Sequence, residues 1–236
     1  MRSYKPIDKI FILGRSGCGK SFLGKSIQSK FSRVVVIDTL REYSGGGFDF
    51  VVDTYETFLK ALVHLEKEKH FKILFRFSLH AAESERIEIF DQLCAAVYHL
   101  GDVCLVIEEV HFYSTPHSLT TWFQNIALTG RHEKIALICT SQRAGLTNKT
   151  LLSMSTYVYC GQMIDLNDQK YIANFIGKNA RDLSELQDRT FIEYSSADPA
   201  NPKIVKNDFL KTGLDFEKKS TVNKKARPKT KTGENP

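Results

Sequence analysis

The sequence predicts an α/β fold in which a mostly parallel central sheet carries helices on both faces. Two observations support this prediction. Short apolar runs rich in β-branched residues, such as KIFIL (9–13) and VVVID (34–38), are typical of strands buried on both faces. Segments with helical spacing of apolar residues separate these runs, and repeated alternation of strand and helix favours parallel strands joined by crossover helices.

The elements are expected in a regular order along the chain. Strands are predicted at 9–13, 34–38, 72–77, 103–109, 134–142 and 156–162, with a terminal hairpin at 190–195 and 203–209. Helices are predicted at 20–31, 54–70, 84–100, 118–130, 147–154 and 166–177. The clearest helix spans 84–100, where one face carries Ile87, Phe90, Leu93, Ala96 and Val97.

The length of 236 residues leaves room for one α/β domain with a sizeable core and little else. We assign this domain to residues 1–216. No apolar run approaches the roughly 18 residues of a membrane span, and the N-terminus has no apolar signal core, so we expect a cytoplasmic protein. The five cysteines are widely spaced and form no C-x-x-C pair, which favours buried, reduced thiols over disulfides or a metal site.

The net charge of +6 is concentrated at the C-terminus. Residues 217–236 contain seven basic and two acidic residues, so this tail carries +5 and residues 1–216 carry only +1. The tail has one valine and no aromatic residue, and it cannot bury enough surface to fold, so we predict that it is disordered. Two roles stay open for it: binding nucleic-acid phosphates, or keeping the chain soluble without a specific partner.

A glycine-rich turn follows the first predicted strand. Residues 14–21, GRSGCGKS, match the P-loop pattern G-x-x-x-x-G-K-[ST] at every fixed position. Glycines let successive N–H groups point at a phosphate, and the helix that begins near Gly19 adds its positive dipole end. In this pattern Lys20 reaches the β- and γ-phosphates and the Ser21 hydroxyl ligates Mg²⁺. We therefore predict an ATP and Mg²⁺ site made of Gly14, Arg15, Ser16, Gly17, Cys18, Gly19, Lys20 and Ser21.

Two adjacent acids end the predicted strand VCLVIEE (103–109). We expect this strand to lie beside the P-loop strand, where an acid holds the Mg²⁺ shell. Glu108 takes that place although Asp is usual, and its extra methylene moves the carboxylate outward by about one C–C bond. Glu109 is expected to be the general base that activates the attacking water. The alternative is a pair of surface glutamates at a strand end.

A polar residue and a cation flank the next predicted strand, 134–142. Gln142 ends the strand and is expected to orient the attacking water as a sensor; an ordinary buried hydrogen-bonding role is the alternative. Arg131 precedes the strand at its opposite end and so cannot easily reach the phosphates of its own subunit. In a ring, a neighbouring subunit could present Arg131 in trans as an arginine finger; a surface ion pair is the alternative.

Two loops follow these catalytic strands, HFYSTPHS (111–118) and RAGLTNK (143–149). They contain Arg143 and Lys149 in one loop, and Phe112 and Tyr113 in the other. We expect both loops to line a channel in which Arg143 and Lys149 contact DNA phosphates. Packing between subunits is the alternative for both loops.

Taken in order, GRSGCGKS, IEEVH, and GRH followed by SQR resemble the FtsK–HerA superfamily of DNA-translocating ATPases. The resemblance covers about residues 8–210, including VIDTLREY and ARDLSELQDRTFIEY, and is strongest to the genome-packaging ATPases of tailless, membrane-containing viruses with double-stranded DNA. It implies a RecA-like P-loop NTPase sandwich, a homo-oligomeric ring (a hexamer or pentamer), double-stranded DNA as partner, and a capsid or portal-vertex protein nearby. It implies the roles given above to Lys20, Ser21, Glu108, Glu109, Gln142 and Arg131. The chain departs from the family at Glu108, where Asp is usual, and at Ala144, where many relatives have proline.

Three other functions stay open on the sequence. A plasmid-transfer or mobile-element ATPase would share every motif. A small-molecule P-loop kinase would need an arginine-rich lid, whereas Arg15, Arg41 and Arg76 are scattered. A nucleotide-binding scaffold without turnover is the non-enzymatic alternative. Residues 1–8 leave no room for the N-terminal barrel of repair-type HerA motors, so we expect a minimal motor.

Overall fold

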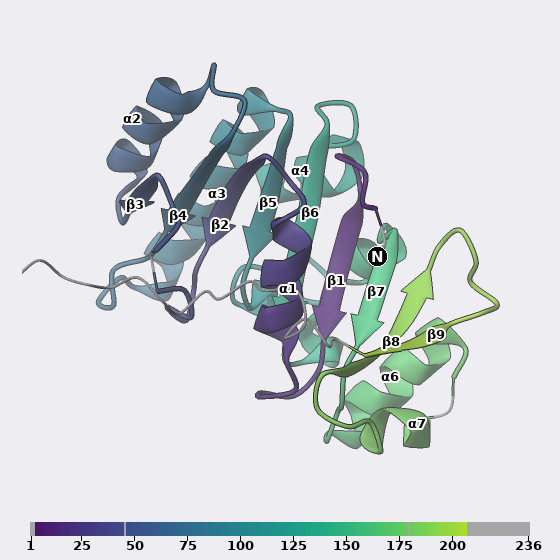
Figure 1. The fold of residues 1–236 in the computed structure, drawn as a ribbon. Coiled ribbons are helices and arrows are strands. Elements are labelled where there is room, and N and C mark those ends of the chain that lie inside the picture. The colour runs from purple at the N-terminus through teal and green to yellow at the C-terminus, as the bar shows by residue number, and fades with distance from the viewer. Residues whose placement is uncertain (1–2, 45, 179, 207–236) are drawn as a thin grey trace, which may run out of the picture.

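The structure, a computed structural model, describes residues 3–44, 46–178 and 180–206. Its centre is a nine-stranded sheet in the order β3-β4-β2-β5-β6-β1-β7-β8-β9 (Figure 1). The strands are β1 Lys9–Leu13, β2 Arg33–Ile37, β3 Phe50–Val52, β4 Phe71–Phe75, β5 Val103–Ile107, β6 Ile135–Ser141, β7 Tyr157–Cys160, β8 Thr190–Ser195 and β9 Lys203–Lys206. Pairing is parallel from β3 through β7, and β8 and β9 form the predicted antiparallel hairpin at the edge.

The helices are α1 Lys20–Gln28, α2 Tyr55–Leu65, α3 Glu83–Leu100, α4 Thr121–Thr129, α5 Lys149–Ser153, α6 Leu166–Ile176 and α7 Ala180–Ser184. Their ends follow from local chemistry. The side chain of Thr54 caps the first turn of α2, the side chain of Asp165 caps α6, and Gly177 ends α6 in the left-handed conformation. Two short elements, β3 and α7, were not predicted, because three to five residues carry too little periodicity to be recognised.

Helices cover both faces of the sheet, as predicted, but unequally. On one face α1 packs Leu23 and Ile27 against alternate residues of the central strands, such as Ile10 and Ile12. The larger core, with α2, α3, α4 and α6, lies on the other face (Figure 1). All five cysteines are free and buried, as predicted. Among the described residues, no helix is both long and apolar enough to cross a membrane.

The order of the strands determines what meets at the site. We predicted that the strand bearing Glu108 and Glu109 lies beside β1, and this is wrong: β6 lies between β5 and β1. The strand also ends at Ile107, so both glutamates belong to the turn after it. Because β1, β6 and β5 are parallel neighbours, their carboxyl ends share one edge of the sheet. The P-loop, Gln142 and the two glutamates are therefore brought together there.

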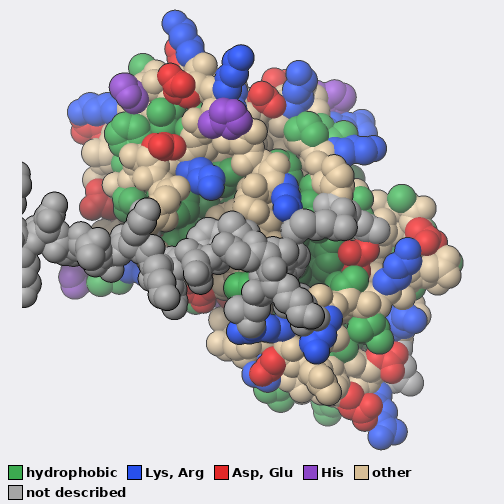
Figure 2. Space-filling model, viewed as in Figure 1, with side chains coloured by type: hydrophobic (Ala, Val, Ile, Leu, Met, Phe, Trp, Pro, Cys, Tyr) green, Lys and Arg blue, Asp and Glu red, His purple; other side chains and the backbone are tan. Residues whose placement is uncertain are grey.

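The charges of the described surface are mixed. On the face in Figure 2, where grey atoms do not cover it, lysine and arginine side chains are interspersed with acidic ones. This agrees with the net charge of +1 for residues 1–216. The end of the last predicted strand, the domain boundary at 216 and the basic tail 217–236 lie outside the described residues.

Candidate nucleotide-binding site

The P-loop curls between β1 and α1 through backbone conformations that favour glycine. Gly14 has φ 147°, and a Cβ atom there would lie 2.8 Å from the sulfur of Cys18. Gly19, at the start of α1, has φ 100°. The loop is held to the segment after β7, since the N–H of Arg15 donates to the carbonyl of Gln162 at 2.7 Å. Its turn of backbone thus has the shape that the motif predicts for a phosphate cradle.

Lys20 is the first residue of α1, directly after this loop, and is almost fully buried. Its ammonium group donates to the carbonyl of Arg15 at 3.2 Å and lies 3.8 Å from Oε1 of Glu109. The structure therefore brings together two of the predicted site residues, the P-loop lysine and one of the glutamates.

Glu109 is held on every side by polar groups. The backbone N–H of Gln142 donates to its Oε2 at 2.9 Å, and the Gln142 side-chain amide donates to its Oε1 at 3.1 Å. Nδ1 of His111 lies 3.3 Å from Oε2. Burial raises the pKa of Glu109, but the contacts with His111, Lys20 and Gln142 outweigh burial and hold it below its usual value. Glu109 is therefore ionised at neutral pH, in contact with the predicted sensor.

Glu108 has a different environment, although it is the adjacent residue. The Thr140 hydroxyl donates to its Oε2 at 2.6 Å, and the Tyr43 hydroxyl donates to its Oε1 at 3.2 Å. Burial raises the pKa of Glu108 to about 7; the hydrogen bond from Thr140 opposes this rise and the charge of Glu42 adds to it. The two glutamates thus differ in protonation, and the alternative of two surface glutamates is wrong because both are buried.

The Ser21 hydroxyl is hydrogen-bonded to the carboxylate of Glu42, in the segment after β2. Ser21, Glu42 and Glu108 offer the oxygen ligands that Mg²⁺ prefers. No three His, Cys, Asp or Glu side chains in the described part of the chain are arranged to hold a metal by themselves. This donor set fits an ion that takes most of its shell from phosphate and water, as Mg²⁺ does in phosphoryl-transfer sites.

Sequence reasoning missed Glu42 and His111. Glu42 lies four residues after Asp38, and its N–H donates to the Asp38 carboxylate at 2.7 Å. The sequence feature that could have pointed to this segment is Asp38, an acid directly after the buried strand β2. For His111 the signal was a polar residue two positions after Glu109.

Arg131 lies where the sequence predicts, in the turn before β6 and so at the opposite end of the sheet from the P-loop. It is exposed, and its charge helps to lower the pKa of Lys9, which burial lowers most. Arg131 therefore lies far from the P-loop of its own chain. Its proposed action in trans stays a prediction.

The predicted DNA-binding residues lie in different settings. Arg143 is half-exposed, and its Nε lies 3.1 Å from the buried Asp168 carboxylate. It lines a cavity of about 300 Å³ together with Arg15, Ser16 and Gln142. Lys149 is exposed at the first turn of α5. The expectation that Tyr113 lines a channel is wrong, because its buried ring stacks on Phe90 with ring centroids 4.2 Å apart.

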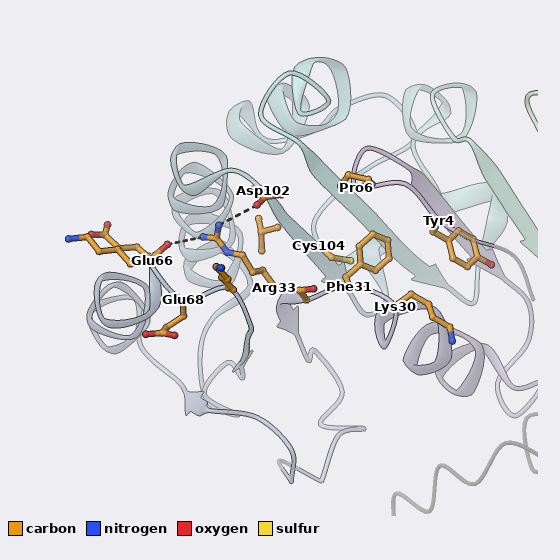
Figure 3. Close-up of a pocket in the computed structure, with 13 residues that line it drawn as sticks. Tyr4, Pro6, Lys30, Phe31, Arg33, Glu66, Glu68, Asp102 and Cys104 are labelled. Carbon is orange, nitrogen blue, oxygen red and sulfur yellow. Dashed lines mark hydrogen bonds and ion pairs between the residues drawn. The ribbon is translucent and has the colours of Figure 1, made fainter.

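A second cavity, of about 440 Å³, lies at the amino ends of the strands (Figure 3). Arg33 crosses it, donating to the Glu66 carbonyl at 3.2 Å and lying 3.6 Å from the Asp102 carboxylate. None of the predicted site residues lines this cavity. The candidate site is therefore defined by the P-loop and not by the larger hollow.

Comparison with known proteins identifies the fold. No protein-family model and no curated protein sequence matches the chain. The chain is similar to the genome packaging NTPase B204 from Sulfolobus turreted icosahedral virus 2 in complex with AMPPCP, at a TM-score of 0.67 and 19% identity over 85% of this chain and 98% of that one. The two chains share a fold. The same protein in complex with ATP-gammaS gives a TM-score of 0.68 at 18% identity, over 86% of this chain and 98% of that one.

The chain is also similar to VirB4 of Thermoanaerobacter pseudethanolicus, at a TM-score of 0.64 and 13% identity, over 84% of this chain and 88% of that one. These similarities confirm the predicted RecA-like P-loop NTPase sandwich. At identities of 13–19% they establish the fold alone.

Proposed function

We propose that the chain is a Mg²⁺-dependent ATPase that translocates double-stranded DNA as a viral genome-packaging motor. The observation that carries the proposal is the meeting of Lys20, Glu109 and Gln142 at the carboxyl edge of the sheet, next to a complete P-loop. The complexes of B204 with AMPPCP and ATP-gammaS support ATP as the nucleotide for the same fold.

The contacts of Lys20 suggest how hydrolysis proceeds. The ammonium group of Lys20 lies 3.8 Å from Oε1 of Glu109. Phosphates in the loop offer Lys20 more negative charge than one carboxylate, so Lys20 turns to them and releases Glu109. The ionised Glu109 then accepts a proton from the attacking water, and the Gln142 amide orients that water. Both side chains already meet at 3.1 Å, so no large rearrangement is needed.

Ser21 and Glu108 would hold Mg²⁺, with Glu42 next to the Ser21 hydroxyl. The ion supplies charge that stabilises the transferring phosphoryl group. The raised pKa of Glu108 fits this role: a carboxyl group that is partly protonated near pH 7 becomes a full anion when a cation approaches.

The motor would be a homo-oligomeric ring, a hexamer or a pentamer, working in the host cytoplasm or on the virion beside a capsid or portal-vertex protein. Arg131 lies at the end of the sheet away from its own P-loop, so it would complete the site of a neighbouring subunit as an arginine finger. Arg143 and Lys149 would contact the phosphates of the DNA in the ring, and the basic tail 217–236 would add salt-sensitive attraction.

A second candidate is a DNA-transfer ATPase of plasmids or mobile elements, which would share every sequence motif of the site. This candidate shares the ATPase chemistry and differs in its partners. A small-molecule kinase and a scaffold without turnover are separated from both candidates by the stimulation of ATP hydrolysis by DNA.

The test measures phosphate release by the full chain with Mg-ATP, with and without duplex DNA. We expect hydrolysis that DNA stimulates, and loss of this stimulation when Arg143 and Lys149 are both changed to alanine. Changing Lys60, an exposed cation on α2, to alanine is the matched control and should keep the stimulation. If duplex DNA does not stimulate ATP hydrolysis by the unchanged chain, the proposed translocase function is wrong. If DNA stimulates the double variant as much as the unchanged chain, only the proposed DNA contacts of Arg143 and Lys149 are wrong.

A further inference from the structure

The segment before β8 packs against the P-loop, although about 170 residues separate them in the sequence. The N–H of Arg189 donates to the carbonyl of Cys18 at 2.9 Å. Next to it, the Asp188 carboxylate accepts a hydrogen bond from the Arg15 guanidinium at 2.6 Å. A Cβ atom on Gly19 would lie 3.2 Å from Cγ of Arg189, so the two segments are in close contact. Residues 188 and 189 therefore lie directly against the P-loop.

Arg189 adopts a backbone conformation that arginine rarely takes. Its φ is 61°, in the left-handed region that favours glycine and, among other residues, asparagine. Glu109, the proposed general base, is another non-glycine residue of the described chain with positive φ, at 53°. Strained backbone of this kind is kept where the surrounding structure holds it, and such positions concentrate at functional sites. Glycine would adopt this φ without strain, so the presence of arginine at position 189 indicates a role for its side chain.

The guanidinium group of Arg189 extends over the ring of Phe22 in the first turn of α1, with 5.4 Å from Cζ to the ring centroid. No hydrogen bond or ion pair connects this guanidinium to another residue in the described ranges, and the side chain is exposed. An arginine that stacks on one aromatic ring keeps its N–H groups available for a phosphate or for a planar base. The P-loop is the nearest structure that is built to hold such a ligand.

The sheet order shows which end of the nucleotide Arg189 would meet. Glu109 and Gln142 follow β5 and β6, on one flank of β1. Arg189 precedes β8, which lies on the other flank beyond β7. A triphosphate whose γ-phosphate faces Lys20, Glu109 and Gln142 extends its α-phosphate and nucleoside away from them, toward the first turn of α1 and Arg189.

We propose that Arg189 is a nucleotide-binding residue whose guanidinium contacts the α-phosphate and nucleoside end of the bound nucleotide. This inference rests on the ATP site proposed above. The contact is made to a part that ATP and ADP share, so Arg189 contributes to the affinity for both. It retains nucleotide in the site and takes no part in cleavage of the γ-phosphate.

The test compares the variant Arg189→Asn with the unchanged full chain by calorimetric titration with ADP and with AMPPCP. Asparagine tolerates the left-handed backbone and keeps the N–H that donates to Cys18, but it has no cation. We expect the dissociation constants of both nucleotides to rise about tenfold, which is the size of one charge-assisted hydrogen bond. The matched control is Arg181→Asn, which removes an exposed arginine paired with Glu185 on α7, and should bind both nucleotides as the unchanged chain does.

A second variant, Arg189→Gly, separates binding from support of the loop. Because glycine relieves the positive φ, we expect the nucleotide-free melting temperature to stay the same or rise, while the dissociation constant for ADP still increases. A parallel loss of melting temperature and affinity in both variants would overturn the inference, since Arg189 would then only support the P-loop.

Three further outcomes of these titrations would contradict the inference. Unchanged ADP binding by Arg189→Asn, or weaker binding of AMPPCP alone, would overturn the placement of Arg189 at the α-phosphate end. If the unchanged chain binds neither ADP nor AMPPCP, the proposed ATP site itself fails, and this inference with it.

Discussion

Replacing Glu109 by glutamine should stop ATP hydrolysis, lower the stability of the nucleotide-free protein and tighten nucleotide binding. The substitution keeps the size of the side chain and removes its charge. Loss of a general base lowers a hydrolytic rate by about 10²- to 10⁴-fold. The two other effects follow from Lys20, whose ammonium group lies 3.8 Å from Oε1 of Glu109.

The size of the stability change can be worked from this distance. At 3.8 Å and an effective dielectric constant of about 20, the attraction between the two charges is about 4 kcal/mol. Part of this is offset by the cost of burying both groups, so we expect a net loss of about 2 kcal/mol. For a domain of this size, that corresponds to a fall of about 4–8 °C in melting temperature. Nucleotide phosphates would then no longer compete with Glu109 for Lys20, so the affinity for ADP should rise about tenfold.

The assays are phosphate release with saturating Mg-ATP, thermal melting without nucleotide, and titration with ADP. The matched control is Glu108→Gln, which changes the adjacent buried acid that hydrogen-bonds Thr140 and Tyr43. It should leave the affinity for ADP without Mg²⁺ near that of the unchanged chain. Full activity of Glu109→Gln together with an inactive Glu108→Gln would show that the two roles are exchanged. An unchanged melting temperature would refute the argument from the Lys20 contact.

Further changes test other parts of the site and the chain. Lys20→Ala should abolish hydrolysis, because it removes the cation that faces the β- and γ-phosphates, and phosphate release by the purified variant checks this. Mixing Lys20→Ala with Arg131→Ala subunits should restore partial activity if Arg131 acts in trans; no recovery in rings shown to be mixed contradicts that role. The pKa of Glu108 in the folded protein is about 7, above its ordinary 4.5, so its contribution to stability is present at low pH and is lost as the pH rises from about 4.5 to 7. Urea unfolding should show this slope in the unchanged chain and not in Glu108→Gln. Deleting residues 217–236 should weaken DNA binding and flatten its dependence on salt while the basal ATPase rate stays the same, as filter binding at two salt concentrations and phosphate release would show.

Much of the architecture was predictable because it is local. The strand, turn and helix of the P-loop lie within 20 consecutive residues. The glycines at 14, 17 and 19 all adopt positive φ, a conformation that glycine in the sequence already indicates. The hairpin β8–β9 was also recognised from two short β-branched runs. The ends of elements were less well predicted. The helix expected over 54–70 ends at Leu65, and the polar residues 66–70 that follow are exposed.

The residues that are chemically able to act can be recognised from the sequence: a lysine and a serine after a glycine-rich turn, two acids after a buried run, and a glutamine after another such run. Which of these residues contact one another depends on the order of the strands in the sheet. Because β6 lies between β1 and β5, Glu109 contacts Lys20, whereas Glu108 accepts hydrogen bonds from Thr140 and Tyr43, although the two glutamates are neighbours in the chain. The contact between Arg189 and the P-loop was likewise invisible in the sequence. Periodicity indicates which side chains of one segment are buried, whereas strand order and loop paths depend on packing between segments that are distant in the sequence.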